Sequence, residues 1–158
     1  MAKSDHEYFM RKAIAAARRG IEAGQTPFGA CIVCRGQMVV CAHNVVWAQT
    51  DITAHAEIHA IRLACRQFEK IDLSGCVIYS TCEPCPMCFS AIHWSGISEI
   101  FYGAGIADAR AAGFHELDIS NRQMKEMGQS PLKVTGGLLA QECRDLFDEW
   151  RRQGGQSY

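Results

Sequence analysis

The sequence predicts an α/β protein in which helices cover both faces of a mixed β-sheet. Three observations lead to this class. Apolar residues recur at helical spacing near both ends of the chain, two β-rich runs around Gly36 are typical of a hairpin, and strand-like and helical segments then alternate. The length of 158 residues fits one domain, so we expect a single domain over residues 1–158.

The first helix is expected between Ser4 and Gly24. Residues 4–7 match a capping box, apolar side chains then recur every three or four positions, and Gly24 interrupts the pattern. From residue 30 to residue 42, two β-rich runs flank a turn at residues 35–37. This segment predicts an antiparallel hairpin, which supplies the first two strands.

The middle of the chain predicts two further helices and two strands. Thr53 can cap a helix whose apolar stripe runs to Phe68, and residues 85–94 are expected to form a short helix. The apolar runs at residues 76–80 and 100–102 are expected to be buried strands.

The last third of the chain predicts less regular structure. Residues 104–130 are polar and interrupted by glycines, so we expect loops with short helical turns there. Residues 132–134 predict a fifth strand, and residues 139–150 predict a final amphipathic helix. Residues 154–158 are expected to form a tail that two glycines, Gly154 and Gly155, make flexible.

Charge and cysteine content limit the classes of function. With 16 basic and 17 acidic residues, the chain has no overall attraction for phosphate backbones or acidic membranes. Its nine cysteines are an odd number, and the first 20 residues are charged rather than leader-like, so we expect reduced thiols and a cytoplasmic protein. No apolar run approaches the roughly 18 residues of a membrane span. The expected core thiols are Cys31, Cys34, Cys41, Cys65, Cys76 and Cys143.

Two short motifs carry the chemistry: H-x-E at residues 55–57 and P-C-x-x-C at residues 84–88. The imidazole of His55 and the thiolates of Cys85 and Cys88 suit Zn²⁺. Three protein ligands leave the fourth tetrahedral position for water, whose pKa zinc lowers from about 16 to about 7. The motifs therefore predict a catalytic zinc site rather than a structural one.

Glu57 is the expected proton carrier of this site. It lies two residues from the ligand His55, close enough to accept a proton from the water and to pass it on to a substrate nitrogen. Such a shuttle contributes roughly 10² to 10⁴ in rate.

Three different kinds of metal site fit the sequence less well. A zinc ribbon would need a fourth ligand, which Cys82 could supply, but it gives no reason for the two motifs to occur together. An iron–sulfur run would need a further thiol after Cys88. A zinc protease would need Glu directly after His55, where Ala56 stands.

The two motifs resemble those of the cytidine deaminase superfamily, and the chain as a whole looks most like its bacterial guanine deaminase branch. The matching positions are, in order, residues 27–29, 44, 53–57, 82–88, 94 and 113–114. The resemblance implies a three-layer α/β/α fold with a mixed five-stranded sheet. It also implies Zn²⁺ as cofactor and the hydrolysis of guanine to xanthine and ammonia.

The same resemblance assigns the substrate pocket. It implies that Phe28 and Trp94 wall a purine, and that Asn44 and the backbone near Ala56 bond its edge. Glu116 is expected to bind the amino group of the purine and to take part in catalysis. The branch often has Asp at that position, so Glu116 extends the side chain by one methylene.

The tail is expected to complete the pocket of a second subunit. In the branch that the chain resembles, a C-terminal segment crosses to the partner and places a terminal tyrosine over its active site. This chain also ends in a tyrosine, Tyr158, which implies a homodimer with swapped residues 154–158.

Several substrates remain open at this point. Guanosine or a triazine such as ammeline could replace guanine in the same chemistry. A tRNA adenosine deaminase would need basic clusters beside the pocket, and the net charge of −1 with the acidic pair Glu116 and Asp118 argues against it. The alternative outside the enzymes is a structural zinc module for protein contacts. We expect a small nucleobase substrate and no nucleic acid or membrane partner.

Overall fold

Five strands form one mixed sheet in the computed structural model, which describes residues 3–158. The strands are β1 (Gly29–Cys34), β2 (Gln37–His43), β3 (Cys76–Cys82), β4 (Glu99–Ala104) and β5 (Lys133–Thr135). Their order across the sheet is β2-β1-β3-β4-β5. β1 is antiparallel to both of its neighbours, whereas β3, β4 and β5 are parallel to one another. The predicted α/β class and five-stranded mixed sheet are confirmed.

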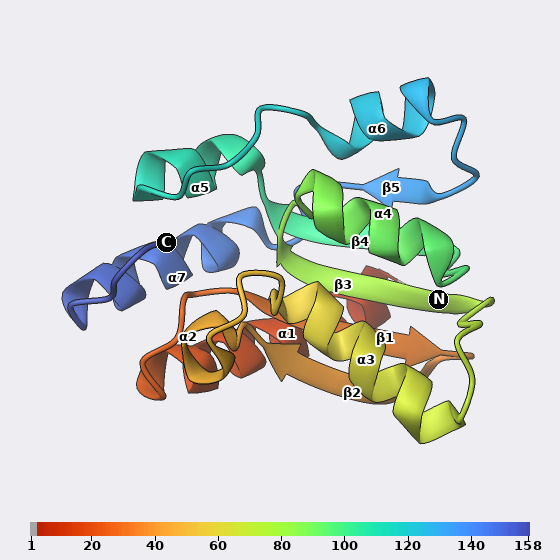
Figure 1. Cartoon of the computed structure of the whole chain (residues 1–158), viewed down its shortest axis with the longest axis horizontal. Coiled ribbons are helices and arrows are strands. Elements are labelled where there is room, and N and C mark those ends of the chain that lie inside the picture. The colour runs from red at the N-terminus through yellow and green to blue at the C-terminus, as the bar shows by residue number, and fades with distance from the viewer. Residues whose placement is uncertain (1–2) are drawn as a thin grey trace.

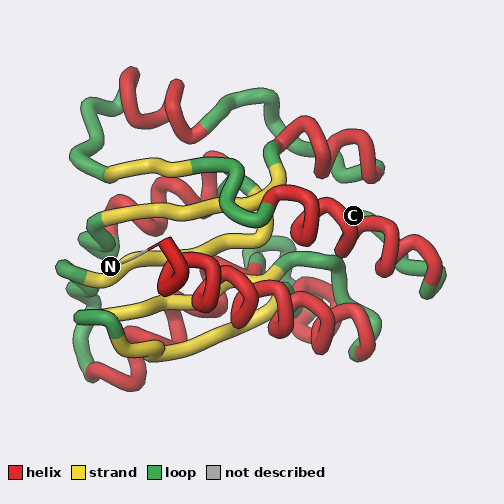
Figure 2. The backbone as a smooth tube through the Cα atoms, turned by 180° about the vertical axis from the view of Figure 1, so that it is seen from behind, coloured by secondary structure: helices red, strands yellow, loops and turns green. Residues whose placement is uncertain are grey.

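Helices cover both faces of this sheet, as Figures 1 and 2 show from opposite sides. On one face lie α1 (Lys3–Glu22) and α7 (Ala140–Arg152), which pack against each other and share one apolar core. On the other lie α3 (Ala56–Phe68) and α4 (Pro86–Trp94), with a second core between them and the sheet. Three short helices complete the chain: α2 (Val46–Gln49), α5 (Ile106–Ala112) and α6 (Asn121–Met127).

The first helix and the hairpin follow their sequence signals with small differences. Because α1 already includes Lys3, Ser4 lies inside the helix and is not its cap. The hairpin turn consists of Arg35 and Gly36, both with positive φ (52° and 76°), as a type I′ turn requires. Gly29 at the start of β1 lies against α1 so closely that a Cβ atom there would meet the backbone oxygen of Ala13.

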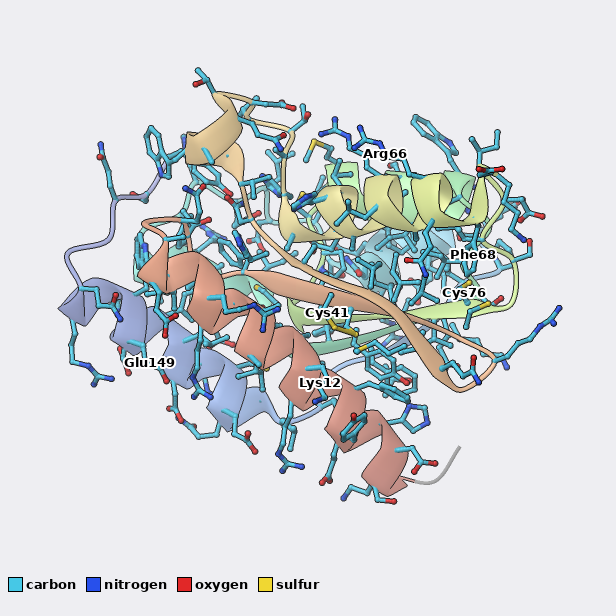
Figure 3. The ribbon with its side chains drawn as sticks, turned by 90° about the horizontal axis from the view of Figure 1, so that it is seen from below. Lys12, Cys41, Arg66, Phe68, Cys76 and Glu149 are labelled. Carbon is cyan, nitrogen blue, oxygen red and sulfur yellow. A yellow bond between two sulfur atoms is a disulfide. The ribbon has the colours of Figure 1, made fainter. Side chains whose placement is uncertain are left out.

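Two expectations about cysteine and capping are corrected. Cys31 lies in the core and Cys41 packs against it, as predicted, but the two are joined by a disulfide rather than reduced (Figure 3). They are direct partners in the antiparallel register of β1 and β2, with Cα atoms 4.1 Å apart.

The start of α3 also differs from the prediction. Thr53 does not cap α3, because its backbone N–H and hydroxyl both donate to Asp51. The cap position belongs to His55.

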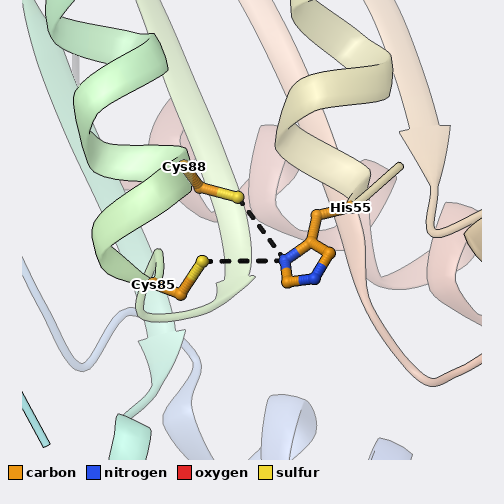
Figure 4. A group of neighbouring side chains, drawn as sticks. All are labelled: His55, Cys85 and Cys88. Carbon is orange, nitrogen blue, oxygen red and sulfur yellow. Dashed lines mark hydrogen bonds between the residues drawn. The ribbon is translucent and has the colours of Figure 1, made fainter. Parts of the chain in front are cut away.

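The parallel part of the sheet positions the functional site. α4 follows β3 directly, and it begins beside the first turn of α3, so that both helices start at the same edge of the sheet (Figures 1 and 4). Among residues 3–158, none of the helices combines the length and the apolar character that crossing a bilayer would require.

Candidate zinc site and substrate pocket

The three predicted metal ligands lie together where α3 and α4 begin. His55 and Cys85 occupy the cap positions of the two helices, and Cys88 lies in the first turn of α4. The Nδ1 atom of His55 is 3.7 Å from Sγ of Cys85 and 3.6 Å from Sγ of Cys88 (Figure 4). All three potential ligand atoms lie within 4.8 Å of one another, which fits a single ion.

The donor set is suited to zinc. A hydrogen bond from Cys88, together with the neighbouring His55, lowers the pKa of the Cys85 thiol to about 4, so this sulfur is ready to bind a cation. Two sulfur ligands and one imidazole favour Zn²⁺ over harder cations. Cys82 stands apart from this group, because its Sγ atom lies 3.6 Å from the backbone oxygen of Gly105, to which it donates. The set therefore has the three protein ligands of a catalytic site.

Glu57 lies next to the ligands in the first turn of α3, and it is only 6% exposed. Its Oε1 atom accepts a hydrogen bond of 3.1 Å from the hydroxyl of Ser80 on β3. Burial raises the pKa of its carboxyl group. The geometry thus holds one fixed, desolvated carboxyl group beside the metal position.

A pocket of about 320 Å³ opens onto this site. Its walls are mostly apolar, and it continues into a small inner recess that both Glu57 and Glu116 line, together with Phe28. Phe28 is fixed by edge contacts with Phe114, at 4.8 Å between ring centroids. Burial raises the pKa of the half-buried Glu116 carboxyl to about 7. The residues around the outer pocket are Ile52, His55, Cys85, Pro86, Met87, Phe114, His115, Glu116, Leu117 and Tyr158.

The C-terminal tail folds back over the pocket of its own chain. The side-chain amide of Asn44, which is fully buried, donates a 2.8 Å hydrogen bond to the hydroxyl of Tyr158. The Tyr158 ring lies 5.8 Å from the His55 ring, and Trp47 donates from its indole nitrogen to the backbone oxygen of Gln156. The expected contact of Tyr158 with the site is therefore made within one chain, and the exchange between subunits stays a prediction.

The two remaining pocket candidates differ in their placement. Ala56 is the first residue of α3 and is fully buried. Its backbone N–H has no carbonyl partner within the helix, because it belongs to the first turn. Trp94, at the end of α4, is 82% exposed and lines a separate hollow with His93 and Met124. Within one chain Trp94 does not wall the pocket, because α4 carries it away from the ligands at its start.

Two further residues of the site were missed at the level of the sequence. Ser80 orients Glu57, and Trp47 fixes the tail. Ser80 is a polar residue at the end of an apolar strand run, a signal that could have been followed. Trp47 precedes the metal motif in a short helix, α2, that the sequence did not predict.

Comparison with known proteins agrees with this site. The family model of the cytidine and deoxycytidylate deaminase zinc-binding region matches residues 3–104. The guanine deaminase of Bacillus subtilis (strain 168) is 43% identical over 113 residues, which are 71% of this chain and 72% of that protein. The tRNA-specific adenosine deaminase of the same organism is 31% identical over 147 residues, 93% of this chain and 89% of that protein.

A solved structure supports the fold over almost the whole chain. The guanine deaminase from Nitrosomonas europaea superposes with a TM-score of 0.85 at 31% identity, covering 92% of this chain and 84% of that one.

Proposed function

Because the chain belongs to the family defined by the cytidine and deoxycytidylate deaminase zinc-binding region and is a zinc-dependent deaminase, we propose that its reaction is the hydrolysis of guanine to xanthine and ammonia. The observation that carries this choice is the pair of carboxyl groups, Glu57 and Glu116, in one recess beside the metal ligands. Guanine presents N–H donors at N1 and at its 2-amino group, and a carboxylate is the matching acceptor. Adenine has an acceptor at N1 and lacks this complementarity.

The residues take separate roles in the proposed reaction. Zinc, held by His55, Cys85 and Cys88, would supply Lewis-acid activation of the attacking water. Glu57 would accept one proton of that water and deliver it to the ring nitrogen, and it would then carry the second proton of the same water to the departing amine, which leaves as ammonia. Its hydrogen bond from Ser80 keeps the carboxyl group aimed at the metal position between these transfers.

The remaining pocket residues would hold the base. Phe28 would contact the ring within the recess, and the N–H of Ala56 would donate to the purine carbonyl. Glu116 would accept from the amino group. Asn44 keeps a second amide hydrogen besides the one given to Tyr158, and Tyr158 would cover the base and exclude water.

An ammonia-release screen on the zinc-loaded protein tests the substrate. Guanine should be the best substrate among guanine, guanosine, adenine, cytosine and ammeline, and Glu57→Gln should lower kcat by roughly 10² to 10⁴ while zinc stays bound. Higher kcat/KM with guanosine or ammeline would replace the substrate and leave the mechanism intact. A kcat of the zinc-bound Glu57→Gln protein equal to that of the wild type would overturn the mechanism.

Deamination of tRNA adenosine is the second candidate, since a tRNA-specific adenosine deaminase is 31% identical over 93% of this chain. The tail stands against it, because Tyr158 lines the outer pocket, where a tRNA loop would have to enter. The formal net charge of −1 also provides little attraction for phosphate. Inosine formation in tRNA at rates above those with guanine would reverse the order.

We further propose that two copies exchange their tails in a homodimer, with Gly154 and Gly155 as the hinge. Gly154 adopts a φ of 71°, which suits a change of direction after α7. Glu57→Gln and a variant lacking residues 154–158 should each be inactive alone. Co-expressed, they should recover activity toward about a quarter of the wild-type value, because half of the dimers would contain one complete site. Absence of recovery in a confirmed heterodimer would show that each tail serves its own chain.

A further inference from the structure

We propose that Cys34 and Cys76 form a thiol-exchange site that accepts small anionic disulfides in a surface pocket remote from the zinc site. Cys34 ends β1, and Cys76, which begins β3, is its direct partner in the antiparallel register. Directly opposed residues of antiparallel strands have Cα atoms about 4.5 to 5.5 Å apart, inside the range of roughly 4.4 to 6.8 Å that a disulfide spans. The two thiols can therefore be joined without moving the strands.

The two thiols differ in access, which fixes the order of their reactions. Cys34 is half-buried and lines a pocket of about 380 Å³, whereas Cys76 is only 1% exposed and is not among the residues that line this pocket. Burial, together with a hydrogen bond to Cys34, raises the pKa of Cys76 above its ordinary value. A reagent from solvent thus meets Cys34 first, and Cys76 is placed to react with what forms on Cys34.

The pocket around Cys34 is suited to an anionic peptide-like ligand. Arg35 and Lys70 supply two positive charges, and Gln37 and Gln67 supply amide groups for polar contacts. Phe68 gives an apolar wall, over which the Lys70 ammonium lies at 5.5 Å from the ring centroid.

The nearby carboxylate does not line the pocket. Asp72 accepts hydrogen bonds from the backbone N–H and hydroxyl of Ser74 within its own loop. The positive charges of Arg35 and Lys70 therefore dominate the lining.

The pocket lies at the opposite end of α3 from the metal ligands. Its lining includes Gln67 and Phe68 from the last turn of α3, while His55 caps the first turn. The thirteen residues of the helix separate the two by about 20 Å. Exchange at Cys34 is thus separate from the chemistry of the zinc thiolates.

The exchange proceeds in two balanced steps. The Cys34 thiolate attacks one sulfur of a disulfide R–S–S–R, which forms a Cys34–S–R bond, breaks the S–S bond of the reagent and releases R–S⁻. The Cys76 thiolate then attacks Sγ of Cys34, forms the Cys34–Cys76 disulfide and expels the second R–S⁻. The two protons given up by the cysteines convert the leaving groups to two thiols, so the protein loses two electrons and the reagent gains them.

Mass spectrometry of the zinc-loaded protein with oxidised glutathione tests this site. Mapping of labelled peptides should identify Cys34 as the first thiol modified, and the adduct should then give way to a Cys34–Cys76 disulfide. Cys76→Ser should trap the adduct on Cys34. Cys65 is the matched control, because it is a half-buried thiol on α3 outside the pocket lining, and Cys65→Ser should leave the reaction unchanged.

A charge variant tests the recognition itself. Lys70→Gln combined with Arg35→Gln should slow the reaction with oxidised glutathione by roughly three- to ten-fold, because two exposed charges are lost. The rate with the neutral bis(2-hydroxyethyl) disulfide should not change. Equal slowing with both reagents would overturn the anion preference, and modification of Cys65 as fast as Cys34 in the wild-type protein would overturn the site.

Discussion

The hydroxyl of Tyr158 provides a sensitive test of the tail as a cover for the pocket. Tyr158→Phe keeps the ring next to His55 and Phe114 but removes the 2.8 Å hydrogen bond with Asn44. Because Asn44 is fully buried, its amide hydrogen would be left without this partner whenever the tail is closed. The cost is about 1 to 2 kcal/mol, which is roughly a five- to thirty-fold shift toward the open tail.

The kinetic consequence is a change in binding more than in chemistry. If Tyr158 holds the base equally in the ground state and the transition state, Tyr158→Phe should raise KM for guanine by that factor with little change in kcat. Steady-state ammonia release measures both constants. Tyr8→Phe on α1 is the control, because Tyr8 is 53% exposed and outside the residues that line the pocket, and its kinetics should match the wild type. An unchanged KM for Tyr158→Phe would refute the tail as a cover.

Three further pairs of variants test the ligand set, the acidic pocket residue and the packing of the sheet. Cys82→Ala should retain one zinc per chain by elemental analysis, whereas Cys88→Ala should lose it, since Cys82 donates to Gly105 and Cys88 is one of the three proposed ligands. Glu116→Gln should lower kcat/KM for guanine by roughly ten- to a hundred-fold through the loss of a charged acceptor, while Asp118→Asn, exposed and paired with Arg110, should leave it unchanged. Gly29→Ala should lower the free energy of unfolding in urea by about 1 to 3 kcal/mol, because its Cβ would meet the backbone of Ala13 and Ala17. Gly105→Ala is the matched control, since its nearest neighbour would be 3.8 Å away, and a loss as large as that of Gly29→Ala would contradict the packing argument.

The metal ligands were predictable from the sequence because their spacing is local. Cys85 and Cys88 lie within one helical turn, and His55 precedes Glu57 at the start of another helix. The α/β class followed in the same way from periodicity. The two helix caps were harder to predict. Ser4 and Thr53 have the right chemistry for a cap, but α1 already includes Lys3, and Thr53 donates to Asp51 instead of capping α3.

Pairings between distant residues could not be predicted from spacing. The disulfide between Cys31 and Cys41 depends on the register of β1 and β2, which includes an irregularity between Ile32 and Val33. The exposed position of Trp94 depends on the direction in which α4 leaves the metal site. Whether the tail reaches its own chain or a partner is likewise a matter of assembly rather than of local sequence.

The residues of the proposed site fall into two parts of the chain, and this division bears on how the choice of substrate could be changed. The metal ligands and Glu57 all lie within residues 3–104, the part that the family model matches, whereas Phe114, Glu116 and Tyr158 lie beyond it. Exchange of residues 105–158 would therefore change the outer pocket wall and the tail, while the metal ligands and Glu57 stay in place. A chimaera that joins residues 1–104 to the C-terminal third of a tRNA-specific adenosine deaminase would be a natural starting point for exchanging one substrate for another.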